Sequence, residues 1–220
     1  MTASTTGPSL EKESKLLDSH RSVIGLDEVG RGAAAGPLVV GAVLLRRIEP
    51  MPAGLNDSKR LTAKTRERLE APIREWSSKW ALGAASNREV DDMGIEQAIR
   101  LATRRALTQL PLGGASLLVD GPRSIAPEDV SGTDGLAPKD VTCVIGGDHL
   151  CASIAAASVL AKVDRDRTMV QIARDDDRYG WDRNKGYLSA EHSAALHAHG
   201  PSRWHRISWN LPKSSPVANP

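Results

Sequence analysis

Acidic residues in this sequence stand at the ends of apolar, strand-like runs. Asp27 and Glu28 lie side by side in one such run, Asp120 closes a second, and Asp148 follows a third after two glycines. An ionised carboxylate removed from water is costly unless a cation accompanies it. If these runs belong to one sheet, their C-terminal ends can converge. Oxygen ligands in that arrangement are typical of a site for Mg²⁺ or Mn²⁺.

Each of these acids also has an ordinary structural interpretation. Asp27 and Glu28 could mark a partly exposed strand end, Asp120 is a common turn former before Gly-Pro, and Asp148 could cap the next helix. Successive strand residues face opposite sides, so Asp27 and Glu28 share a site only if the strand ends or bends near Gly30. The sequence has no cluster of His or Cys that would favour zinc.

The glycine-rich stretch Gly30-Arg-Gly-Ala-Ala-Ala-Gly36 loosely matches a dinucleotide-binding fingerprint. That fingerprint requires a helix to begin at the glycines. Here Pro37 and the β-rich run 38–43 follow instead. We therefore interpret the stretch as a tight turn with glycines at positive φ.

The elements that must position these residues form a mixed α/β or α+β pattern. Strands are predicted over residues 22–28, 38–46, 80–86, 116–119 and 141–145, with the first two antiparallel. A charged helix begins at Thr62 and is interrupted or ended by Pro72. A second helix, capped by Asp91 and Asp92, carries an apolar stripe from Ile95. A long apolar helix over 150–174 and a short one over 190–199 complete the pattern, and residues 123–140 are predicted to be a surface loop.

Length and composition favour one folded domain over residues 20–211, with solvated tails at 1–19 and 212–220. The formal charge of +2 neither requires nor excludes a nucleic-acid partner, so a phosphate-binding face must be local. Cys143 and Cys151 are expected to be reduced, buried thiols of a cytoplasmic protein. No run reaches the roughly 18 apolar residues that a membrane helix needs, and residues 1–19 do not resemble a signal peptide.

Several motifs in register resemble a known family. Gly25-Leu-Asp-Glu-Val-Gly-Arg-Gly-Ala-Ala-Ala-Gly-Pro37 resembles the first motif of type 2 ribonucleases H, in their bacterial ribonuclease HII branch. The segments that agree in the same order are Leu55–Leu61, Ser153–Val163, Lys185–Tyr187 followed by Glu191-His192, and Gly200–Arg206. The resemblance spans about residues 23–209. It implies a ribonuclease H-like α/β fold, in which helices flank a mixed five-stranded sheet, with a small C-terminal helical annex.

The resemblance also implies an activity and a catalytic site. The expected enzyme is an endoribonuclease that hydrolyses the RNA strand of RNA–DNA hybrids and nicks duplex DNA 5′ of single ribonucleotides. It leaves 3′-hydroxyl and 5′-phosphate ends, and its roles are ribonucleotide and RNA primer removal. Asp27, Glu28, Asp120 and Asp148 are implied as the catalytic residues and the ligands of two Mg²⁺ or Mn²⁺ ions. Asp27 would bridge the ions, Asp148 would complete the site of the attacking water, and Glu28 and Asp120 would complete the other.

A second set of residues is implied to bind substrate. The residues are Gly30, Arg31, Gly32, Lys59, Lys162, Lys185 and Tyr187. The backbone of the Gly-Arg-Gly turn is expected to read the 2′-hydroxyl, and the tyrosine to contact the ribonucleotide and stack on the next sugar. The lysines are expected to contact phosphates. Lys162 lies in an otherwise apolar helix and needs an anionic partner, whereas Lys59 and Tyr187 also fit ordinary loop positions.

Departures from the family pattern are few. Trp181 and Asn184 stand where Phe and His are expected, and the 123–140 loop is longer than expected. Two other functions remain open from the residues: another nuclease or strand-transfer enzyme of this fold, and a non-catalytic binder of hybrids. We expect no extra N-terminal binding domain before the motifs, which argues against the HIII type. We expect a cytoplasmic monomer that binds nucleic acid and no membrane; a sliding-clamp contact stays open.

Overall fold

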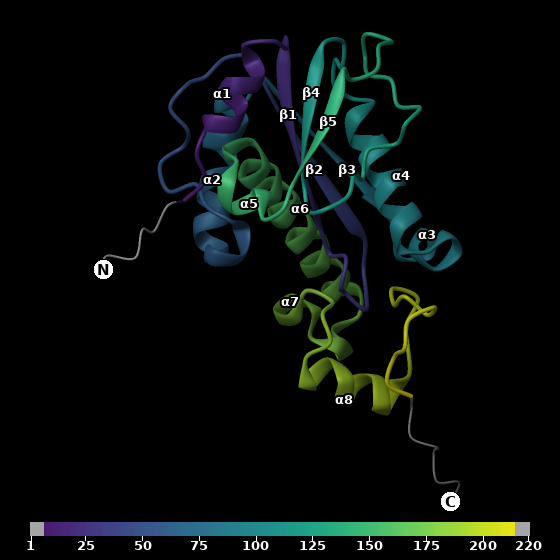
Figure 1. Cartoon of the computed structure of the whole chain (residues 1–220). Coiled ribbons are helices and arrows are strands. Elements are labelled where there is room, and N and C mark those ends of the chain that lie inside the picture. The colour runs from purple at the N-terminus through teal and green to yellow at the C-terminus, as the bar shows by residue number, and fades with distance from the viewer. Residues whose placement is uncertain (1–6, 214–220) are drawn as a thin grey trace, which may run out of the picture.

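The computed structural model describes residues 7–213. One sheet has the strand order β3-β2-β1-β4-β5. Its strands are β1 (Ser22–Val29), β2 (Leu38–Leu45), β3 (Lys79–Ala85), β4 (Ala115–Asp120) and β5 (Asp140–Val144). β1 is antiparallel to β2 and parallel to β4, which is in turn parallel to β5. The C-terminal ends of β1, β4 and β5 therefore lie at one edge of the sheet (Figure 1).

Helices cover both faces of this sheet. They are α1 (Glu11–Leu17), α2 (Ala63–Trp76), α3 (Asn87–Met93), α4 (Ile95–Leu107), α5 (Gly147–Leu150), α6 (Ala152–Asp175), α7 (Trp181–Asn184) and α8 (Ala190–His199). The α4 helix packs its predicted apolar stripe on one face, and α2 and α6 pack on the other. The predicted fold, a mixed five-stranded sheet flanked by helices, is confirmed.

The α6 helix lies unusually close to the sheet. Its first ten residues are buried on all sides, as the apolar run predicted. A Cβ atom at Gly41 of β2 would overlap the backbone carbonyl of Ala157 on α6. Glycine at 41 thus lets helix and sheet backbones touch, and this contact brings the next residue of α6, Ser158, to the β1 edge where Asp27 lies.

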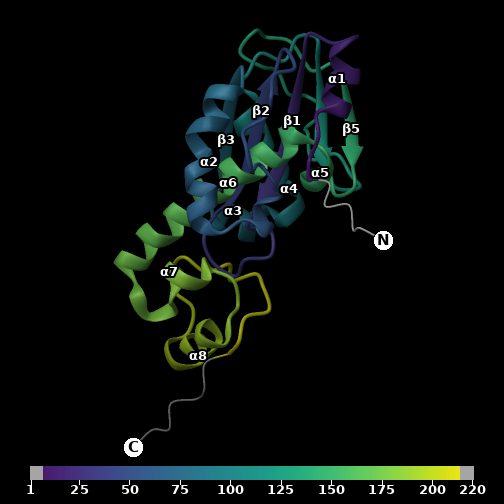
Figure 2. The same cartoon turned by 90° about the vertical axis from the view of Figure 1, so that its left-hand side faces the viewer.

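The C-terminal part forms a lobe beyond one end of the sheet, next to the connection between β1 and β2 (Figure 2). The backbone N–H groups of Ala34 and Ala35 donate to the Gly186 carbonyl, at 2.8 and 3.2 Å. The Arg206 N–H donates to the Ala34 carbonyl at 2.8 Å. The lobe is therefore joined to the β1–β2 turn by main-chain hydrogen bonds.

A chain of imidazole hydrogen bonds fills the core of this lobe. Nδ1 of His192 lies 2.9 Å from the Tyr187 carbonyl and must donate to it, so Nε2 of His192 accepts from Nε2 of His205, also at 2.9 Å. Nδ1 of His205 then accepts from the Ser202 N–H at 2.8 Å. This pattern requires both rings to be neutral. Burial lowers the pKa of both, that of His205 to about 4.

The prediction of a solvated tail over residues 1–19 is wrong from residue 7 onward. Helix α1 docks on the domain, and Glu13 is fully buried. Its Oε1 accepts from the N–H and the hydroxyl of Ser153, both at 2.8 Å. The residue before α6, Cys151, supplies no side-chain cap, so this distant carboxylate satisfies one of the N–H groups at the helix start that have no partner within the helix. Residues 1–6 and 214–220 lie outside the described part of the chain.

Three local predictions are also wrong. Pro72 does not end α2, because it lies on the exposed side of the helix, where water can solvate the carbonyl that loses its partner. Asp91 and Asp92 do not cap α4, whose N-cap is Gly94 without a side-chain hydrogen bond. Both lie within α3, which Ser86 starts in a capping box with Glu89, and Asp91 accepts from the backbone of Ile207 and Ser208. The Cys143 thiol is exposed on the edge strand β5, although Cys151 is buried as expected.

Within the described residues, none of the helices has the length and apolar character needed to cross a bilayer.

Glu13 generates a prediction on stability against pH. Burial raises the pKa of this carboxyl above its unfolded value of about 4.3, so its contribution to stability is complete below that pH and is lost as pH rises through the folded pKa. The Glu13→Gln variant keeps the acceptor oxygen and cannot ionise. In urea unfolding from about pH 4.5 to 8, we expect it to lose less stability with rising pH than the parent.

The matched variant Glu13→Ala leaves the Ser153 N–H without its acceptor. It should be destabilised by about 1–3 kcal/mol across the whole pH range. A Glu13→Gln protein with the same pH slope as the parent would contradict this interpretation.

Candidate active site

The sheet brings the predicted carboxylates to one edge. The last β1–β4 pair is Leu26 with Val119, so Asp27 and Asp120 are each one residue beyond it. Asp148 follows β5 in the short helix α5, and Oδ1 of Asp120 accepts from the backbone of Gly147 at 2.7 Å, next to Asp148. Glu28 adds the fourth carboxylate.

Asp27 and Glu28 share this edge although they face opposite sides of β1. The strand does not end there, since it continues to Val29 in its pairing with β2. Pairing with β4 stops at Leu26. Beyond this residue, β4 no longer covers the side of β1, and side chains from either face can reach that side. Asp27 is on the α6 side and is 4% exposed, whereas Glu28 is half-buried on the other and lies 3.6 Å from Arg31. Loss of the β4 partner, not a bend, lets both side chains line one cavity.

The acids at this edge raise one another's pKa. Burial raises the pKa of Asp27 to about 8, and repulsion from Glu28 and Asp120 adds to it. Burial and repulsion from Asp120 raise the pKa of Glu28 against the attraction of Arg31. Burial, then repulsion from Asp148, raises the pKa of Asp120. The cluster therefore carries more negative charge than its protein surroundings compensate, which is the property expected of a cation site.

A lysine and two further polar residues stand beside Asp148. Nζ of Lys59 is 3.1 Å from Oδ2 of Asp148, and the Lys59 backbone N–H donates to the buried Asp57 at 2.9 Å. His149 lies 3.6 Å from Asp57 and 3.8 Å from Asp148, and the three side chains could together hold a metal ion. Sequence reasoning missed Asp57 and His149. Asp57 lies within the 55–61 motif, as the residue before Ser58-Lys59, and this was the available signal.

A cavity of about 250 Å³ adjoins the carboxylates. Most of the residues expected to bind substrate line it, namely Gly30, Arg31, Gly32, Lys59, Lys162 and Tyr187, together with Asp27 and Glu28. Lys185 does not line it: its ammonium group donates to the Asp182 carbonyl, and the residue lines a neighbouring cavity between α2 and α6. The glycine-rich turn, Tyr187 and two lysines thus line one hollow.

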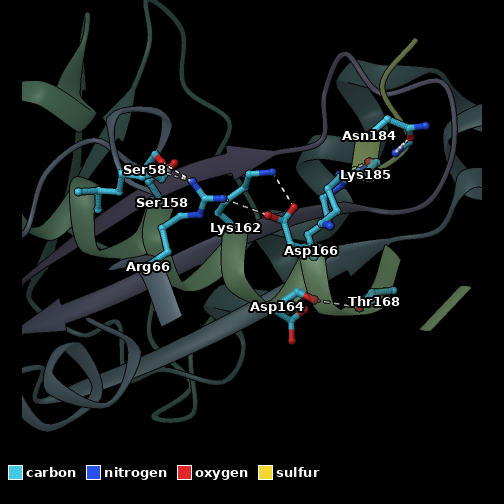
Figure 3. Close-up of polar contacts among 12 residues, drawn as sticks. Ser58, Arg66, Ser158, Lys162, Asp164, Asp166, Thr168, Asn184 and Lys185 are labelled. Carbon is cyan, nitrogen blue, oxygen red and sulfur yellow. Dashed lines mark hydrogen bonds and ion pairs between the residues drawn. The ribbon is translucent and has the colours of Figure 1, made fainter. Parts of the chain in front are cut away.

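Lys162 has its anionic partner within the protein. Its Nζ is 2.6 Å from Oδ1 of Asp166, and Arg66 reaches the other oxygen of the same carboxylate at 3.3 Å. Figure 3 shows Lys162 and Arg66 both directed at Asp166. The ammonium group also lies 5.8 Å from the centre of the Tyr187 ring. The apolar surroundings of Lys162 therefore do not by themselves require a phosphate.

Two residues that depart from the family pattern, Trp181 and Asn184, make contacts that hold the segment before Tyr187 in place. Oδ1 of Asn184 accepts from the Gly186 N–H at 2.8 Å, and its Nδ2 donates to the Tyr179 carbonyl at 2.7 Å. Trp181 is fully buried and stacks on Tyr179 with ring centres 4.9 Å apart. Both residues hold the turn before Tyr187 from within the lobe.

The chain is similar to proteins of known type. A family model described as Ribonuclease HII matches residues 24–211. The chain belongs to the ribonuclease HII family. It is 44% identical over 200 residues to a ribonuclease HII of Streptomyces coelicolor, covering 91% of this chain and 82% of that protein.

Solved structures agree with this assignment. The ribonuclease H2 of Pyrococcus horikoshii superposes with a TM-score of 0.68 at 25% identity, covering 86% of this chain and 94% of that one. Bst-RNase HIII in complex with Mn²⁺ shares the fold, with a TM-score of 0.62 at 20% identity over 90% of this chain and 70% of its own. The protein is therefore a ribonuclease H hydrolase, and its family and fold support endoribonuclease activity on RNA–DNA hybrids.

The raised pKa of Asp27 generates a prediction on metal-free stability. As a carboxyl whose folded pKa is raised, Asp27 contributes fully only below its unfolded pKa of about 3.9, and this contribution is lost as pH rises toward about 8. Asp27→Asn cannot ionise. In EDTA near pH 8 we expect it to be more stable than the parent by about 1–3 kcal/mol, a difference that shrinks toward pH 4.

Calorimetric unfolding in EDTA across this pH range measures the difference. The exposed Asp92, replaced by Asn, is the matched control and should leave the stability curve unchanged. An Asp27→Asn protein that is less stable than the parent at pH 8 would show that the carboxylate is held favourably in its charged form.

Proposed function

We propose that the protein cuts the RNA strand of RNA–DNA hybrids and nicks duplex DNA on the 5′ side of a single embedded ribonucleotide. The observation that carries this proposal is the group of four carboxylates beside a cavity lined by Gly30, Gly32 and Tyr187, in a chain of the ribonuclease HII family. The physiological roles that fit this activity are removal of ribonucleotides from DNA and of RNA primers.

Two divalent ions, Mg²⁺ or Mn²⁺, fit the carboxylate edge. Asp27, Glu28, Asp120 and Asp148 would hold them, since carboxylate oxygens are the ligands that these ions prefer. The mutual elevation of the acid pKa values supports this assignment, because a cation would remove the repulsion. When bound, the ions supply a nucleophilic water at neutral pH and stabilise the charge on the leaving oxygen.

The ends of the product follow from the bond that breaks. The oxygen of water bonds to phosphorus, the bond from phosphorus to the 3′-oxygen breaks, and that oxygen takes up a proton. The upstream strand then ends in a 3′-hydroxyl, and the ribonucleotide carries the 5′-phosphate. Lys59, held 3.1 Å from Asp148 with an exposed side chain, would neutralise the acid before a cation enters and then contact a phosphate.

Selection of ribonucleotides would rest on the 2′-hydroxyl, which distinguishes RNA from DNA. The backbone of Gly30–Gly32 lines the cavity and can approach a sugar closely. A Cβ atom at Gly32 would meet no protein atom within 4 Å. The protein thus leaves the space beside Gly32 open, and the half-exposed ring of Tyr187 stands at the same cavity for stacking.

An assay on a duplex with one ribonucleotide tests the proposal. We expect nicking 5′ of the ribonucleotide in Mg²⁺ or Mn²⁺, none in EDTA, and none by Asp148→Asn. Gly32→Ala should keep the fold and its Mn²⁺ affinity, because the methyl group meets no protein atom, yet lose about tenfold or more in kcat/KM by misplacing the sugar. Cleavage of an all-DNA duplex at a similar rate, or full activity in Asp148→Asn, would refute the proposed function.

The salt dependence of binding tests Lys162. If this lysine neutralises one phosphate, Lys162→Ala should weaken binding and reduce the slope of log Kd against log salt by about 0.9. Lys139→Ala, just before β5 and away from the carboxylate edge, should leave the slope unchanged. An unchanged slope in Lys162→Ala would mean that the lysine serves only as the partner of Asp166.

A further inference from the structure

Arg165 on α6 is a fully buried cation that bonds two separate chain segments. Its Nε donates to the Pro37 carbonyl at 2.8 Å and its Nη2 to the Ala35 carbonyl at 3.1 Å. Its Nη1 donates to the Lys185 carbonyl at 2.9 Å. The first two carbonyls belong to the glycine-rich turn between β1 and β2, and the third to the segment that ends in Tyr187. One guanidinium therefore links the two parts that line the substrate cavity.

No hydrogen-bond partner of the Arg165 guanidinium within residues 7–213 is a carboxylate. Burial lowers the pKa of this arginine, which reflects the cost of keeping its charge out of water. A hydrophobic residue would fill the space at lower cost, and a lysine could not reach three carbonyls in one plane. The charged, planar group is thus suited to fixing the geometry of the two segments.

The surrounding backbone is shaped to receive this guanidinium. A Cβ atom at Gly30 would overlap Nε of Arg165, and Gly30 has φ +89°, so glycine is required there on both grounds. The guanidinium carbon also lies 5.4 Å from the centre of the Tyr187 ring, within cation–π range. Arg165 therefore touches both the sugar-reading turn and the ring at the cavity.

A second buried arginine provides an internal comparison. Arg206 donates to the carbonyls of Arg31 and Gly36, at 3.0 to 3.3 Å. These acceptors all lie in the glycine-rich turn. Arg206 holds that turn alone, whereas Arg165 sets the turn and the Tyr187 segment in one relative placement.

We infer that Arg165 is a positioning residue that couples the glycine-rich turn to Tyr187, and so sets the preference for a single embedded ribonucleotide over a continuous hybrid. The inference rests on the proposed function. A single ribonucleotide presents one ribose followed by deoxyribose, so both segments must be in register at that step. A continuous hybrid offers a ribose at every position and tolerates a looser placement.

The experiment compares kcat/KM on a duplex with one ribonucleotide and on a hybrid of the same sequence. Arg165→Gln and Arg165→Lys should lower the ratio of the two values by about tenfold or more, with Mn²⁺ affinity within about twofold of the parent. Arg206→Gln should lower both activities and leave the ratio unchanged. The exposed Arg167, which pairs with Glu70, is the control and should change neither when replaced by Gln.

A double-mutant cycle separates coupling from general weakening. In a Tyr187→Ala background, Arg165→Gln should no longer change the ratio, because the two residues act through one another. An unchanged ratio in a folded Arg165 variant, or a change that adds independently to that of Tyr187→Ala, overturns the inference. Loss of folding or of Mn²⁺ binding in both Arg165 variants also overturns it and makes the residue a general structural one. If the parent cuts neither substrate, the proposed function itself fails.

Discussion

Incompletely compensated acidic side chains at one edge of the sheet are the constraint on which the rest of the structure depends. Three parallel strands end there, and their acids are held close together with too little water to screen them. Burial and mutual repulsion raise the pKa of Asp27 to about 8 and raise those of Glu28 and Asp120. Folding must hold this arrangement against repulsion whenever no cation is present. The elements around it are accordingly braced by buried side chains that bond the main chain.

Most of that bracing runs through α6. Glu13 satisfies the start of the helix, Gly41 lets its first third touch the sheet at Ala157, and Arg165 near its middle bonds the glycine-rich turn and the Lys185 carbonyl. Each of these contacts joins α6 to a residue that is distant in the sequence, and so fixes the position of the helix more specifically than local sequence preference does. The helix thereby sets the distance between the carboxylates and the cavity wall. Loop residues do not have to set it.

Local patterns in the sequence were sufficient for the sheet and for the convergence of acids. The strands are apolar runs ended by Gly or Asp, and parallel order brings such ends together, so the region of Asp27, Asp120 and Asp148 could be anticipated. The hydrogen-bond partners of the buried charged residues could not be predicted from the sequence. Nothing near Glu13 in the sequence shows that it caps a helix 140 residues away, and nothing around Arg165 marks three carbonyls as its acceptors.

Lys162 is another residue whose partner could not be predicted from the sequence. An isolated lysine in an apolar helix does need an anion, and that reasoning was sound. The partner, however, is Asp166 one turn further along, a residue that the pattern alone would assign to solvent. Ion pairs of this kind depend on which side of a helix faces the domain, and that is decided by packing.

The long helix α6 also fixes the distances between the side chains that it carries. Ser158, Lys162 and Arg165 stand four and three residues apart, so they are separated by rises of about 6 and 4.5 Å along one axis. A single substitution by a residue other than proline leaves that spacing intact. An insertion or deletion of one residue between Ser158 and Arg165 would turn everything beyond it by about 100° and shift it by about 1.5 Å, so that Arg165 would no longer reach the Pro37 and Lys185 carbonyls. The number of residues between Ser158 and Arg165 must therefore stay constant for both side chains to keep their places.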